Sequence, residues 1–203
     1  MNKEKEQKRV QPKKTEEGLS YSVEVRDKEG RVIQRISAPS HCFTEQWNQI
    51  VNIHAKYTNS MVRQTNGVEI STSESGYCLR VSAAIGVTNN GLRVGKGFTP
   101  VAIDDYALET PLEEGAGVDQ FNHQVVTFTA PAVVGTTCSF TVKRIFVNNS
   151  GATITGIREI GAYVQMGATG VNYALGFRDV LPGAVIVPDG GSITVTYTIP
   201  VTV

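Results

Sequence analysis

The stretch 98–117, FTPVAIDDYALETPLEEGAG, gathers side chains that could do chemistry. Its carboxylates, together with one just beyond it, are Asp104, Asp105, Glu109, Glu113, Glu114 and Asp119. Clustered carboxylates can act as general acids and bases, or they can hold a hard cation such as Ca²⁺. No Lys or Arg lies between Ala102 and Gln120, so the tract has no local cation to neutralise it.

The spacing of these carboxylates does not fit a known catalytic or metal-binding pattern. A glycosidase pair must face each other across roughly 5 to 10 Å, whereas Asp104 and Asp105 would point to opposite faces of a strand. The order of residues also lacks the D-x-[DN]-x-[DN]-G pattern of a calcium loop. Prolines and glycines punctuate the tract at Pro100, Pro111, Gly115 and Gly117. We therefore predict an exposed acidic loop at 104–119, which either binds a cation adventitiously or pairs with a basic patch on a partner.

The histidines and cysteines form no recognisable constellation. They are His41, His54, His123, Cys42, Cys78 and Cys138. None lies in a Gly-x-Ser-x-Gly, C-x-x-C or H-E-x-x-H pattern, so we predict no catalytic residues, no metal ligands and no cofactor site. The three cysteines are expected to be buried reduced thiols, and His54 a packed residue on a helix.

The tract 90–97, NGLRVGKG, superficially resembles a phosphate-binding loop. The first required glycine is Asn90, and Gly97 stands where Ser or Thr should follow Lys96. Because no helical pattern follows, the backbone amides would lack a helix N-terminus aimed at phosphate. We predict a glycine-rich turn between strands.

The composition is that of one domain with no strong charge preference. The chain has 203 residues, a formal net charge of zero and 20 glycines, and 19% of its residues are charged. A neutral balance argues against binding to nucleic acid or a membrane surface. No run approaches the roughly 20 apolar residues of a membrane span, and the polar first residues do not resemble a secretory signal, so we expect a protein made in the cytoplasm.

The chain divides into a charged arm and a folded body. Residues 1–18, MNKEKEQKRVQPKKTEEG, are too polar to bury much surface and are expected to be disordered alone. A solvated tail, an arm that orders on a neighbouring subunit and a nucleic-acid contact are the alternatives. Residues 19–203 are predicted to form a single domain.

Most of that domain has strand character. The expected strands are a hairpin over 21–36, then 77–87, 125–130, 138–147, 153–166, 184–188 and 192–203. A second hairpin is expected at Asn148–Gly151. One helix is predicted over 43–57, with its Trp47 face on a sheet and with Ser40 or Thr44 as its N-cap.

These elements favour an all-β fold, an antiparallel β-sandwich of jelly-roll type with one short helix and an extended N-terminal arm. Pro200 cannot donate to a sheet ladder, so the last strand is expected to lie at an edge or to be interrupted there. An exposed edge invites pairing with another chain.

Several segments resemble the structural proteins of tailed-bacteriophage particles, found in heads, necks and tails. The similar segments are 94–117 with the downstream Phe121, 146–164, 177–201 and the helical 40–47. The resemblance implies a jelly-roll-like virion component without a catalytic role, located on the capsid exterior or at the portal, neck and tail junction. It implies other virion proteins and copies of itself as partners.

A carbohydrate- or receptor-binding module on a fibre is the alternative function. Its candidate stacking residues are Trp47, Tyr57, Tyr77, Tyr106, Tyr163 and Tyr173. A hydrolase that uses Asp104 and Asp105 is the third possibility.

Overall fold

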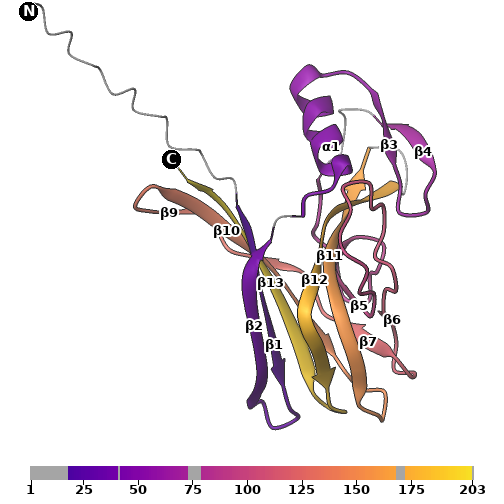
Figure 1. Cartoon of the computed structure of the whole chain (residues 1–203), viewed down its shortest axis with the longest axis vertical. Helices are drawn as coiled ribbons and strands as arrows, with labels where there is room; N and C mark the ends of the chain where they lie inside the picture. Colours follow the sequence, from indigo (N-terminus) through magenta and orange to yellow (C-terminus); the bar gives the residue numbers. More distant parts are fainter. Residues whose placement is uncertain (1–17, 41, 73–78, 168–171, 203) are drawn as a thin grey trace, which may run out of the picture.

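The computed structural model describes residues 18–40, 42–72, 79–167 and 172–202, and these form the predicted all-β sandwich with one helix (Figure 1). In chain order the elements are β1 (Leu19–Arg26), β2 (Val32–Ser40), α1 (Glu45–Lys56), β3 (Ser60–Arg63), β4 (Glu69–Thr72), β5 (Gly91–Gly95), β6 (Glu113–Glu114), β7 (Gln120–His123), β8 (Thr127–Phe128), β9 (Ala132–Val134), β10 (Thr137–Val147), β11 (Ile154–Met166), β12 (Asn172–Val187) and β13 (Ser192–Thr202). The predicted arm at 1–18 lies outside these residues except for Gly18.

The larger sheet has the order β2-β1-β13-β10-β7-β6, and β8 and β9 also pair with β10. β1 and β2 form the predicted first hairpin. β13 lies between β1 and β10 over Ser192–Thr198. Beyond Thr198, β10 is its one partner among the described residues. Pro200 therefore occupies a stretch of β13 where one edge pairs with no described strand, which suits its missing N–H.

A second sheet with the order β12-β11-β5 packs on the first and closes the sandwich. The core between them is apolar and includes Val23 and Tyr197 from one sheet and Ile160 and Phe177 from the other. The small hairpin β3–β4 forms a separate two-stranded sheet, and Val62 of β3 packs into the same core. This strand order does not confirm the predicted jelly-roll topology.

The predicted hairpin at Asn148–Gly151 is wrong. β10 belongs to the larger sheet and β11 to the smaller one, so this corner carries the chain between the two layers. The buried Asn148 fixes the crossing, because its Nδ2 donates hydrogen bonds to the carbonyls of Ala152 and Val187. An amide side chain that replaces backbone partners is a usual way to hold such a turn.

Three strand predictions also need correction. The run 77–87 forms no strand within its described part, where only Arg80 makes an isolated bridge to Gln165. The 125–130 strand shrinks to β8, and the 184–188 strand is the end of the much longer β12. The tract 90–97 is not a turn, because β5 is a fully buried strand paired with β11.

The helix packs its Trp47 face on β12, as predicted. The ring centroids of Trp47 and Phe177 lie 6.0 Å apart. Thr44 occupies the N-cap position, but its hydroxyl donates to the carbonyl of Leu175 instead of capping the helix. The buried face consists of Gln46, Ile50 and Ile53, while the expected apolar residues Val51 and Tyr57 are exposed. No helix in the described ranges is long and apolar enough to cross a membrane.

Candidate functional site

The acidic tract wraps around a buried arginine, Arg178 on β12, which is 1% exposed. Its Nε donates to Glu159 at 3.0 Å, and its NH1 donates to Asp105 at 2.8 Å. Glu109 lies 3.6 Å from NH2. Burial acts to lower the pKa of Arg178, but the hydrogen bonds with Asp105 and Glu159 outweigh it and the pKa is raised. This arginine therefore stays charged and holds three carboxylates in place.

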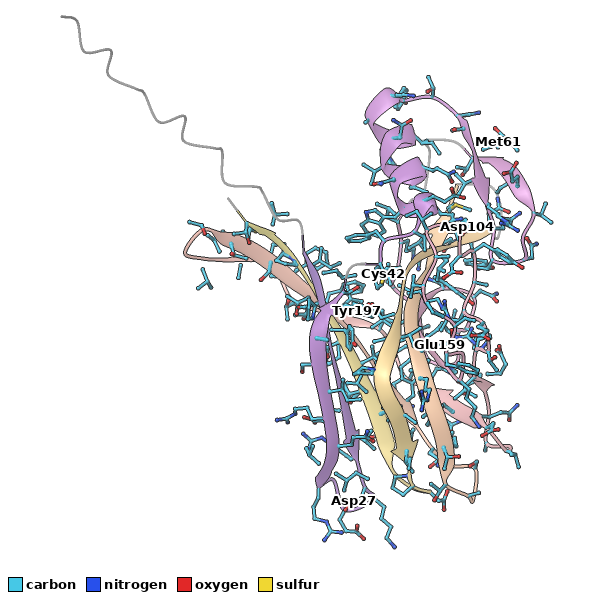
Figure 2. All side chains as sticks on the ribbon, viewed as in Figure 1. Asp27, Cys42, Met61, Asp104, Glu159 and Tyr197 are labelled. Atoms are coloured by element: carbon cyan, nitrogen blue, oxygen red, sulfur yellow. The ribbon has the colours of Figure 1, made fainter. Side chains whose placement is uncertain are left out.

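Glu159 anchors the same tract from β11 and is fully buried (Figure 2). Its carboxylate accepts backbone hydrogen bonds from Gly97, Glu109 and Thr110 at 2.7–3.0 Å. Three amides and one guanidinium satisfy this carboxylate, so it has a structural role and not that of a general acid. For Glu109, hydrogen bonds from Thr99 and Phe98 lower the pKa of the carboxyl group.

Glu113 and Asp119 pair with basic side chains and Glu114 bonds to a histidine, whereas Asp104 forms no ion pair with any described residue. Glu113 pairs with Arg93 at 3.0 Å, and Asp119 with Lys96 at 2.6 Å. Glu114 accepts from the ring of His123 at 2.8 Å and from its backbone N–H at 2.7 Å. Arg93 and Lys96 therefore neutralise part of the predicted acidic loop, while the Glu113 and Asp119 side chains remain 56% and 45% exposed.

His123 is buried on β7 and its pKa falls to about 4. Burial is the main cause; the hydrogen bond with Glu114 opposes it, and the nearby Arg93 and Arg144 lower the pKa further. A neutral imidazole at this depth is a packed residue. His54 is exposed on α1, contrary to the prediction, and His41 lies outside the described residues.

Arg144 is a second fully buried arginine that the sequence reasoning did not single out. It donates to the carbonyls of Gln124, Leu92, Ala84 and Val87, and burial lowers its pKa to about 10. A signal exists in the sequence, since each buried arginine interrupts an apolar strand, in GLRVG, VKRIFV and GFRDV. A charged residue inside such a run predicts a paired, buried charge.

The cysteines do not form the predicted set of buried thiols. Cys138 is exposed on β10, Cys42 is half-buried, and Cys78 lies outside the described residues. Within the described ranges no group of three or more His, Cys, Asp or Glu side chains is placed to hold a metal ion.

Two clefts flank the segment Tyr106–Leu108. The first, of about 480 Å³, is lined by Arg63, Asp104, Asp105 and Arg178 among others. The second, of about 440 Å³, brings together Tyr106, Tyr163 and Tyr173, three of the predicted stacking residues. The Arg63 guanidinium lies 4.1 Å from the centre of the Tyr106 ring, so Tyr106 forms the wall between the two clefts.

The other aromatic candidates do not join this cluster. Trp47 packs on Phe43 at 4.9 Å and belongs to the periphery of the core. Tyr57 is 77% exposed at the end of α1. Tyr77 lies outside the described residues.

A different surface lies where the larger sheet extends beyond the smaller one. β9 and the adjoining ends of β10 and β13 project from the body as a three-stranded wing, formed by 132–134, 137–140 and 199–202 (Figure 1). Val133, Cys138 and Val201 are direct cross-strand neighbours, so their side chains share one face. Val133 is 73% and Val201 48% exposed.

This row continues the inner face of the sandwich. Side chains two residues apart on a strand share a face, so the face that carries the buried Val142 also carries Phe140 and then Cys138. Val142 is buried in the core, whereas Cys138 at the end of the same row is exposed. A cleft of about 330 Å³ separates the end of β13 from α1, and its lining includes Phe43 and Trp47. The wing thus exposes apolar side chains, on the same face as the core residues, beside an apolar cleft.

Comparisons with protein-family models, with curated proteins and with solved structures each found no match for this chain.

Proposed function

We propose that this chain is a non-enzymatic structural protein of a tailed-bacteriophage virion, and that it assembles through subunit interfaces on the capsid exterior or at the portal, neck and tail junction. The sequence resemblance supports the virion assignment. The observation that carries the assembly role is the wing, whose inner face continues the core and is covered by no second layer of described residues. Contiguous exposed apolar surface of this kind marks interaction sites.

A second copy of the chain is the occupant that we assign to the wing face. The neutral overall charge does not oppose self-association. The wing also has two strand edges that pair with no described residue, along β9 and along β13 beyond Thr198. A specific interface buries roughly 800 Å² of surface on each partner. The single row of Val133, Cys138 and Val201 is too small to supply that area alone. The wing of one copy therefore enters the cleft between β13 and α1 of the next.

The arrangement of charged groups supports a structural role over hydrolysis. Asp105, the carboxylate of the proposed pair that lies deeper, is held by Arg178 and by the backbone N–H of Ala102. Both hydrogen bonds reach the same carboxylate oxygen, Oδ2, so this oxygen is already engaged as an acceptor within the fold. The acidic tract thus shapes the surface around the clefts.

Sedimentation velocity of the purified protein tests the assembly role. We expect concentration-dependent association that V133D and V201D each weaken about tenfold or more, because a charge must then be desolvated in the interface. V118D is the matched control, since Val118 is 81% exposed in the loop before β7, away from the wing. A wild-type protein that stays monomeric at its highest soluble concentration contradicts the proposed assembly.

Mass spectrometry of density-purified particles tests the virion assignment separately. We expect peptides of this chain at constant stoichiometry to the major shell protein across the particle peak. Their absence from intact particles overturns the assignment, even if the isolated protein associates with itself.

A further inference from the structure

The cleft that contains the three tyrosines has the construction of a small-molecule site. Tyr106 comes from the long connection after β5, Tyr163 from β11 and Tyr173 from β12. Its volume of about 440 Å³ lies within the roughly 300–1,000 Å³ of ligand pockets. Three aromatic side chains from distant parts of the chain therefore line one concavity of suitable size.

The floor of this cleft is rigid. Tyr163 is 6% exposed, and its hydroxyl accepts a hydrogen bond from the backbone N–H of Leu108 at 3.0 Å. Leu108, Tyr163 and Leu175 form a small apolar cluster of their own beneath the cleft. A preformed floor lowers the entropy cost of ligand binding.

The walls leave aromatic surface accessible. Tyr106 is 36% exposed, and the Arg63 guanidinium covers it from the neighbouring cleft. Tyr173 is half-buried, and no aromatic contact with another ring or cation occupies it within the described residues. Tyr106 and Tyr173 can therefore offer ring surface to a ligand that is flat and partly apolar.

The rim offers neutral hydrogen-bonding groups that other described residues leave largely unused. The side chains of Thr65, Thr88 and Asn89 line the cleft and make no hydrogen bond with any described residue. Asn66 uses its side-chain oxygen to accept from Val68 and keeps its amide N–H groups for other partners. The one ion pair in the lining, Arg93 with Glu113, neutralises itself at 3.0 Å.

We propose that this cleft is a saccharide-binding site, with Tyr106 and Tyr173 stacking on a sugar ring and with Thr65, Thr88, Asn66 and Asn89 bonding to its hydroxyls. A sugar ring presents apolar C–H groups on its faces and hydroxyls around its edge, which matches rings on the walls and neutral polar groups on the rim. Phosphate-bearing ligands fit poorly, because the only guanidinium in the lining is already paired. Of that ion pair Glu113 is the exposed member, which favours neutral over acidic sugars.

The proposal does not depend on assembly through the wing, since the cleft and the wing share no residue. A monomer that binds glycans would refute the assembly role and leave this inference intact. Particles that contain the protein but bind no glycan would refute this inference and leave the virion assignment intact.

Binding of fluorescently labelled full-length protein to a printed array of neutral and acidic oligosaccharides, followed by titration calorimetry with the best neutral hit, tests the site. We expect Y106A and Y173A each to weaken binding about tenfold or more. Y57A is the matched control, because Tyr57 is an exposed tyrosine outside the cleft, and it should bind as the wild type does.

N89A adds a variant that removes a rim group without touching the core, since Asn89 is exposed. It should weaken binding while the thermal unfolding temperature stays unchanged. Absence of any glycan binding by the wild type overturns the proposal, and so does binding that survives in Y106A and Y173A.

Discussion

At the scale of single residues, the feature that organises the region around the clefts is a set of buried arginines. Arg178 and Arg93 form ion pairs with carboxylates of the acidic tract. Arg144 donates hydrogen bonds to backbone carbonyls within 84–92 and to that of Gln124. Removing one partner of such a buried charge leaves the other without compensation, which is costly. Buried charged groups therefore fix the irregular connection after β5 to the neighbouring strands.

His123 gives this charge network a pH dependence. Its pKa is about 4 in the folded protein, against about 6.5 in an unfolded chain. Between these values the unfolded chain binds a proton that the folded protein does not, so stability is full above pH 6.5 and is lost as the pH falls toward 4. Glu114, Arg93 and Arg144 are the charged groups that face the imidazole.

We expect the wild type to lose roughly 2 kcal/mol of unfolding free energy from this group between pH 7 and pH 5, and H123Q to lack that loss. Urea denaturation of both proteins at the two pH values measures the difference. The absolute stability of H123Q at pH 7 does not affect the comparison, because only the change with pH is read. Equal changes in both proteins would show that His123 is not held neutral.

Only part of the site was predictable at this scale. Tyr106, Tyr163 and Tyr173 were expected as candidate stacking residues, but nothing in the sequence places them in one cleft. The acidic tract was predicted to be solvated because its cations come from far along the chain; Arg178 lies 73 positions beyond Asp105. Pairing across such separations depends on the strand order, which local patterns do not contain.

At the scale of elements, the sequence predicted the long alternating strands and missed those that break a local rule. β12 contains Gly176, Pro182 and Gly183, so its first part does not look like a strand, although β11 pairs with it along most of its length. The apolar residues of 81–87 look like a strand, but the carbonyls of Ala84 and Val87 bond to Arg144 instead of a ladder. Tertiary hydrogen bonds override the local preference in both places.

Close packing within the smaller sheet gives a test at this scale. A Cβ at Gly161 on β11 would lie 2.6 Å from the carbonyl oxygen of Phe177, whereas a Cβ at Gly183 on β12 would meet nothing within 4 Å. We expect G161A to lower the unfolding free energy by about 1–3 kcal/mol, because the two strands must separate.

G183A is the control, with little change or a small gain, since alanine restricts the unfolded chain. Urea denaturation curves report both variants. Equal stability of G161A and the wild type would mean that β11 and β12 lie farther apart than described.

At the scale of the whole molecule, the sandwich followed from many short strands, frequent turn signals and a single helical pattern. The unequal extent of the two layers did not, because the pattern that makes Phe140 and Val142 core residues also continues through Cys138. Alternation tells which face of a strand is apolar, but not where the covering sheet ends. The wing, on which the proposed assembly role rests, is visible only once the strands are paired into two layers.

The thiol of Cys138 lies at the centre of the apolar row, between Val133 and Val201, and it reports directly on whether that face is covered. The decisive measurement is the rate of maleimide labelling at Cys138, read by peptide mass spectrometry over a series of protein concentrations. If a second copy covers the wing, the rate falls as concentration rises and stays high in V133D, where association is weakened. A labelling rate that is the same at every concentration would contradict the central claim.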